Sequence, residues 1–157
     1  MLTISSPAFA NNESIPRKYT AQGENISPPL EWSGVPDRTK SFVLVIDDPD
    51  APDPRAPQRT WVHWVLYDIP AEISSLSADV ARHGLPAGTR SGLNDWKRTA
   101  YGGPSPPVGQ HRYFHILYAL DLVLPDLEHP TKQRLLNAMR GHVLAVAQLI
   151  GMYRICR

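Results

Sequence analysis

The sequence predicts a mainly β protein that forms a single domain over residues 1–157. Sixteen prolines are about twice the usual share, yet 42% of the residues are hydrophobic, so the prolines belong to a folded chain. Because helix interiors exclude proline, most of these positions are expected in loops and at strand ends. Three apolar segments of strand length give the second reason to expect a β fold.

The three main strands are expected at residues 41–47, 61–69 and 112–124, with short edge strands near 2–5 and 30–32. The first is apolar almost throughout, which is typical of a strand covered on both faces. Alternation in the third strand separates the face of Tyr113 from the face of Phe114 and Ile116. In the second strand, alternation puts Trp64 on the face opposite His63.

One long helix is expected over residues 131–150. Its apolar positions step by three or four residues: Leu135, Met139, Val143, Val146 and Ile150. Pro130 precedes this segment, and Gly151 stands where a C-terminal cap is expected. A weaker helical turn is expected over residues 72–76.

Composition argues against several classes of protein. The formal net charge is only +1 and the basic residues are scattered, so no nucleic-acid partner is expected. No apolar run reaches the ~18 residues of a membrane span, so no membrane insertion is expected. Residues 1–10 lack the features of a signal peptide, and a single Cys156 allows no internal disulfide. We therefore expect a cytoplasmic location.

The first loop with candidate functional residues follows the strand at 41–47 and contains Asp48 and Asp50. Their carboxylates can orient a histidine, bind a ligand amine or a metal, or simply cap an Asp-Pro turn. His63 in the second strand is either a hydrogen-bonded core residue or a ligand-binding group. The residue types alone leave these alternatives open.

The second such loop covers residues 101–113, is rich in glycine and proline, and ends at His111 and Tyr113. Side chains two residues apart in a strand share a face, so this imidazole and phenol should open onto the same place. Arg112 points to the other face, toward a structural salt bridge or a rim contact. The loop itself is either an anion-binding nest of backbone N–H groups or a rigid connector.

Together these groups predict one small pocket for a phosphate monoester or a carboxylate. Both histidines and the loop N–H groups are expected to donate to the anion, while the acidic pair raises the histidine pKa values. Affinity should then increase as the pH falls through about 6.5. No nucleophile-elbow motif occurs, Cys156 is remote in sequence, and Ser105 has no expected base beyond His111.

Several segments resemble the phosphatidylethanolamine-binding protein family. They are Asp48-Pro49-Asp50-Ala51-Pro52, Trp61-Val62-His63-Trp64, and Gly103-Pro104-Ser105-Pro106-Pro107 followed by Gly109 and His111-Arg112-Tyr113. Residues 15–32 are similar to its bacterial and archaeal branch, the Raf-kinase-inhibitor-like proteins. The resemblance implies a Greek-key β-sandwich of antiparallel sheets with a short crossover and a C-terminal α-helix.

The resemblance also implies a non-enzymatic protein that binds small anions such as phosphoethanolamine and regulates or inhibits a kinase or a protease. The implied ligand-binding residues are Asp48, Asp50, Ala51, Pro52, Trp61, His63, Gly103, Ser105, Pro106, His111 and Tyr113. No cofactor and no metal are expected. The alternative is a metal-dependent hydrolase that uses the histidine and aspartate side chains of the same pocket.

A homodimer is expected, with its interface away from the pocket mouth. The expectation rests partly on the resemblance and partly on Trp32, Trp64 and Trp96, which give more aromatic surface than the strands need. Tryptophan in such places is either a lid over the core or an interface anchor, and both alternatives stay open.

Overall fold

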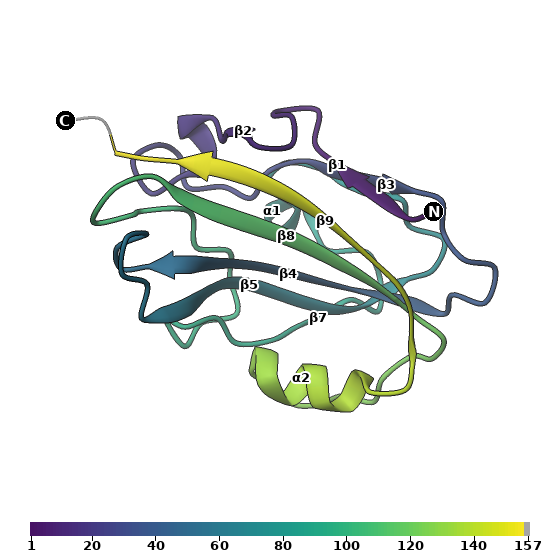
Figure 1. The fold of residues 1–157 in the computed structure, drawn as a ribbon. Helices are drawn as coiled ribbons and strands as arrows, with labels where there is room; N and C mark the ends of the chain where they lie inside the picture. Colours follow the sequence, from purple (N-terminus) through teal and green to yellow (C-terminus); the bar gives the residue numbers. More distant parts are fainter. Residues whose placement is uncertain (156–157) are drawn as a thin grey trace.

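The computed structural model describes residues 1–155, in which two β-sheets are accompanied by two short α-helices (Figure 1). The strands are β1 Thr3–Ser5, β2 Glu13–Ser14, β3 Leu30–Ser33, β4 Ser41–Ala51, β5 Arg59–Pro70, β6 Ser75–Leu76, β7 Arg90–Ser91, β8 His111–Leu120 and β9 Val143–Tyr153. The helices are α1 Val80–His83 and α2 Lys132–Met139, and a 3₁₀ turn spans Arg17–Tyr19.

The larger sheet has the strand order β2-β9-β8-β4-β5-β7, and the smaller has the order β1-β3-β6. Neighbouring strands are antiparallel except β2 and β9, which are parallel. The smaller sheet lies against one face of the larger, and α2 lies below the opposite face in the view of Figure 1. The predicted mainly β architecture with a helix near the C-terminus is therefore confirmed.

Strand β4 separates two hydrophobic cores, which explains why its sequence is apolar at nearly every position. Phe42 and Leu44 face the smaller sheet, whereas Val43 and Val45 face α2, and all four are fully buried. On β8, Tyr113 belongs to the first core and Leu120 to the second, as alternation predicts.

Strand β5 contains a bulge that the alternating pattern did not reveal. One step along β4, from Ile46 to Asp47, corresponds to two steps along β5, from Trp64 to Val62. The extra residue is His63, and its ring packs against Tyr113 in the same core that holds Trp64. The prediction that Trp64 faces away from His63 is therefore wrong, because the bulge turns both side chains toward one side.

The prediction of a helix over residues 131–150 is wrong in its second half. Thr131 caps α2 by accepting a hydrogen bond from the backbone N–H of Arg134, but Gly141 has a φ of +81° and the helix has ended before it. From Val143 onward the chain is strand β9, which pairs with β8 along its whole length. The apolar residues beyond Met139 have helical spacing, but this segment forms a strand. Its backbone N–H and C=O groups find their hydrogen-bond partners on β8.

Other boundaries also differ from the prediction. β4 continues through the Asp-Pro segment to Ala51, and β8 ends at Leu120 rather than at residue 124. The prediction of a helical turn over residues 72–76 is wrong, because Ser75–Leu76 forms β6 and pairs with β3. No helix within residues 1–155 is long and apolar enough to cross a membrane. Cys156 lies outside the described residues.

Two of the three tryptophans expected to be either lids over the core or interface anchors are core residues. Trp32 is 5% exposed and Trp64 is 2% exposed, so neither is available to a partner. Trp96 is 42% exposed and is described with the site. The homodimer itself stays a prediction.

The apolar face of α2 should carry much of the stability of the second core. Leu135 is fully buried there, so Leu135→Ala should lower the free energy of unfolding by about 2–5 kcal/mol. The matched control Gln133→Ala, on the exposed face of the same helix, should change it by less than about 0.5 kcal/mol. Urea unfolding of both variants checks this, and equal effects would contradict the packing described.

Candidate functional site

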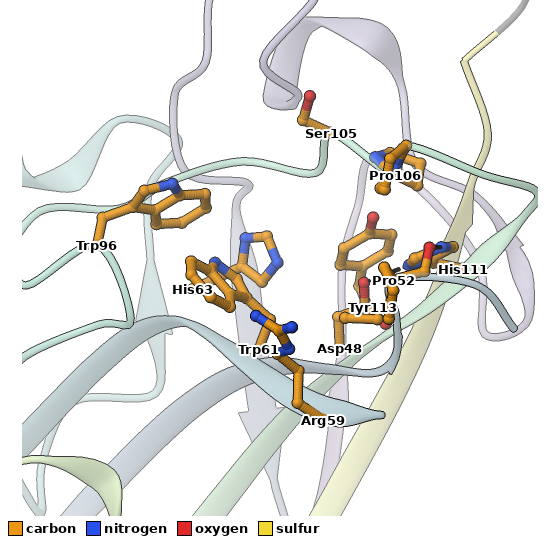
Figure 2. Close-up of a pocket in the computed structure, with 12 residues that line it drawn as sticks. Asp48, Pro52, Arg59, Trp61, His63, Trp96, Ser105, Pro106, His111 and Tyr113 are labelled. Atoms are coloured by element: carbon orange, nitrogen blue, oxygen red, sulfur yellow. Dashed lines mark hydrogen bonds and ion pairs between the residues drawn. The ribbon is translucent and has the colours of Figure 1, made fainter. Parts of the chain in front are cut away.

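A pocket of about 220 Å³ opens where β4, β5 and β8 meet the loop over residues 103–110 (Figure 2). Its lining residues are Asp48, Ala51, Pro52, Arg59, Trp61, His63, Trp96, Ser105, Pro106, Pro107, His111 and Tyr113. Every site residue predicted from the sequence is among them except Asp50 and Gly103. The pocket thus brings together residues from three strands and two loops.

Asp50 does not line the pocket because Arg112 occupies its carboxylate. Arg112 donates from Nε and Nη2 to the two carboxylate oxygens at 3.0 and 2.8 Å, and its backbone N–H donates at 2.9 Å. These bonds hold the pKa of Asp50 below its usual range. The predicted structural salt bridge of Arg112 is therefore confirmed, and its partner is one of the predicted site carboxylates.

Gly103 also has a structural role instead of a place in the pocket. Its N–H donates to Oδ1 of Asn25 at 2.8 Å, and an added Cβ would lie 2.6 Å from the carbonyl oxygen of Tyr19. Glycine is needed because the loop packs against the segment at residues 19–25.

The same loop has few backbone N–H groups to offer a ligand. The N–H of Gly102 donates to the carbonyl oxygen of His63, and prolines 104, 106 and 107 have no N–H. Between residues 102 and 107 only the N–H of Ser105 is left for a ligand.

His111 is held from both sides by acceptors. Its Nδ1 lies 2.5 Å from Oδ2 of Asp48, and its Nε2 lies 2.8 Å from the carbonyl oxygen of Val108. Burial raises the pKa of Asp48, against the lowering effect of the His111 ring. Whichever group of this pair holds the shared proton, neither ring nitrogen of His111 is free to donate to a ligand. The expectation that both histidines donate to an anion is wrong for His111.

His63 is neutral in the folded protein near pH 7. Its Nδ1 lies 2.7 Å from the carbonyl oxygen of Gly102, which can only accept, so Nδ1 carries the hydrogen. Burial lowers the pKa of His63 to about 4, although nearby Asp95 favours the charged form. The expectation that the acidic pair raises the pKa of this histidine is therefore wrong, because desolvation lowers it more than the Gly102 carbonyl and Asp95 raise it.

Tyr113 lies between the two histidines on the pocket floor. Its ring is edge-on to His63 at 5.3 Å and nearly parallel to His111 at 6.4 Å between centroids. The hydroxyl makes no hydrogen bond to any residue between 1 and 155, and Figure 2 shows it pointing into the pocket. Burial raises the pKa of Tyr113, so its O–H remains a donor at every physiological pH.

Arg59 and Trp96 were not among the predicted site residues. Arg59 begins β5 opposite Ala51, a position that places its guanidinium at the pocket mouth. Trp96 is edge-on to both Trp61 and His63, with centroids 5.5 and 5.1 Å away. The lid interpretation of Trp96 fits this position, although the cavity it covers is the pocket rather than the core.

Buried Asn94 positions this lid. Its Oδ1 accepts from the backbone N–H of Trp96 and of Arg98, both at 3.0 Å, and its Nδ2 donates to the carbonyl oxygen of Ala100. An asparagine just before an aromatic residue in a polar stretch was the available sequence signal. Alternation and strand patterns carry no information on such a loop.

The buried neutral histidines should make the protein sensitive to acid. His63 and His115 have pKa values of about 4 when folded, whereas an unfolded histidine has about 6.5. The unfolded chain therefore binds more protons between these values, and stability should decrease as the pH falls from 6.5 to 4. Each histidine contributes on the order of 3 kcal/mol over this window.

Urea unfolding at a series of pH values measures this effect. Buried carboxyl groups with raised pKa, such as Asp48, contribute with the opposite sign, so variants isolate the histidine part. His115→Gln should flatten the dependence between pH 6.5 and 4, whereas His83→Gln, at an exposed position, should leave it unchanged. An unchanged slope in His115→Gln would refute the assignment.

Comparison with known proteins finds relatives that match nearly the whole chain. Residues 5–154 match the family model described as phosphatidylethanolamine-binding protein. A UPF0098 protein of Methanothermobacter thermautotrophicus is 49% identical over 155 residues, covering 98% of this chain and 99% of the relative.

Two crystal structures are similar over almost the whole chain. A putative phosphatidylethanolamine-binding protein homologue, CT736 of Chlamydia trachomatis, is 40% identical with a TM-score of 0.90, covering 99% of this chain and 98% of that one. YbcL of E. coli, described as a member of the mammalian PEBP family, is 30% identical with a TM-score of 0.88, covering 99% of both chains. The chain belongs to the phosphatidylethanolamine-binding protein family.

Proposed function

We propose that the protein is a non-enzymatic binding protein for small phosphate monoesters of the phosphoethanolamine type. The observation that carries the proposal is one pocket lined by both the free hydroxyl of Tyr113 and the side chain of exposed Arg59. A buried phenol offers a directed hydrogen bond to a phosphoryl oxygen, and a guanidinium matches the charge and shape of the anion.

The size of the pocket supports a head group rather than a whole lipid. About 220 Å³ is below the ~300–1,000 Å³ of pockets that enclose drug-sized ligands. Walls of tryptophan and proline surround the few polar groups, so the ligand's substituent would lie against apolar surface while its phosphate reaches the floor. A role as regulator or inhibitor of a kinase or a protease would be exerted through a ligand-dependent surface at this mouth.

The polar groups of the pocket favour binding over hydrolysis. Ser105 Oγ accepts from Gln22 at 3.3 Å, and no imidazole contacts it as a base would. Within residues 1–155, no cluster of three or more His, Cys, Asp or Glu side chains has the arrangement of a metal site. The hydrolase alternative predicts turnover of p-nitrophenyl phosphate, with or without added divalent metal, whereas our proposal predicts none.

Calorimetric titration of phosphoethanolamine at pH 6 tests the proposal. We expect 1:1 binding that weakens about 2–10-fold in Tyr113→Phe, as for loss of one hydrogen bond. Arg59→Gln should weaken binding similarly and make it less sensitive to salt. Arg55→Gln is the matched control, because Arg55 pairs with Asp53 and lies outside the lining. Absence of binding at millimolar ligand would refute the proposed function.

A further inference from the structure

The pocket floor carries two uncharged polar groups of opposite hydrogen-bonding character. Tyr113 presents an O–H that has no partner among residues 1–155, and it is a donor. His63 presents Nε2, because Nδ1 is held by the Gly102 carbonyl at 2.7 Å. With the hydrogen on Nδ1, Nε2 has a lone pair and can only accept. Figure 2 shows Nε2 pointing into the space beside Tyr113.

The groups around His63 keep it in this state. Trp96 and Tyr113 cover the two sides of its ring at 5.1 and 5.3 Å, and the residue is 4% exposed. The charged or titratable groups that face it are Asp95 in the loop after β7, Asp48 on β4, His111 and Tyr113 on β8, and Arg59 at the mouth. Asp48 is engaged by His111, and Asp95 Oδ2 accepts from the N–H of Val62 at 2.6 Å.

We propose that the pocket selects a phosphate monoester that carries one proton, with one phosphoryl oxygen accepting from Tyr113 and the P–OH donating to Nε2 of His63. This inference rests on the proposed function and adds to it the protonation state of the ligand. A fully deprotonated phosphate is acceptor-only, so one oxygen would face the lone pair of His63 in a desolvated site. Binding of the dianion therefore requires the uptake of one proton, which lies between Nε2 and the phosphoryl oxygen.

The proton requirement makes two predictions for the wild-type protein. Affinity should fall about tenfold per pH unit above the second pKa of the ligand, which is ~6 for a simple phosphate monoester. Methyl sulfate has the same shape and charge as singly protonated methyl phosphate but no proton to donate. It should bind at least about tenfold more weakly at pH 6.

Calorimetric titrations from pH 5.5 to 8 test this with methyl phosphate, methyl sulfate and difluoromethylphosphonate. Fluorine lowers the second pKa of the phosphonate, so the pH at which its affinity begins to fall should move down by the same amount. If the loss of affinity came from titration of a protein group alone, it would begin at the same pH for methyl phosphate and for difluoromethylphosphonate. That result would overturn the proposal.

Two variants assign the effect to individual residues. His63→Gln supplies an amide that can donate, so it should bind methyl sulfate and lose the pH dependence. Tyr113→Phe should weaken every ligand while the pH dependence remains. Thermal unfolding verifies that each variant is folded, and the wild-type comparisons decide the question if His63→Gln is not.

The outcomes separate this inference from the proposed function. If no phosphate monoester binds at any pH, the proposed function fails. If methyl phosphate binds with equal affinity from pH 5.5 to 8, or methyl sulfate binds as tightly, the proton requirement is overturned while phosphate binding stands.

Discussion

The bulge in β5 is the constraint on which the pocket depends. Without the extra residue opposite the Ile46–Asp47 step, alternation would point either His63 or Trp64 toward α2. With it, Trp64 fills the core between the sheets and His63 reaches Tyr113 at the end of the same core. The pocket is therefore the continuation of the hydrophobic core beyond the point where the sheets stop covering each other, and its histidine is desolvated like a core residue.

Much of the fold and of the site could be predicted from the sequence, and the successes share a physical basis. The faces of β8 follow from a period of two, so Tyr113 toward the pocket and Arg112 away from it were both predictable. The failures concern choices made by tertiary contacts. Val143 and the residues after it have helical spacing, but strand β8 offers them a complete hydrogen-bonded ladder.

The candidate site shows the same division between local and long-range causes. The sequence places Asp50 beside Asp48, yet only the fold brings the guanidinium of Arg112 within 2.8 Å and removes that carboxylate from the pocket. Gly103 stands in a glycine-rich loop, but the Tyr19 carbonyl and Asn25 account for it. Trp96 carries no strand or helix signal, and its position depends on the buried Asn94. The types of residue in the sequence predicted most of the pocket lining. Long-range contacts such as the ion pair between Arg112 and Asp50 decide which of those polar groups can reach a ligand.

The electrostatics of the pocket limit the pH range in which a proton-bearing ligand could be held. Below about pH 4 the lone pair of His63 is lost to protonation, and above the second pKa of the ligand, ~6, the P–OH is lost instead. Between these values a neutral His63 and a protonated ligand coexist, so binding would be maximal on a plateau rather than at a sharp optimum. Stability is expected to decrease across the same interval because His63 and His115 are buried in their neutral forms. A bound ligand that occupies Nε2 would oppose part of that loss, because it binds the folded chain alone. Ligand binding and acid stability are thus coupled through one buried nitrogen.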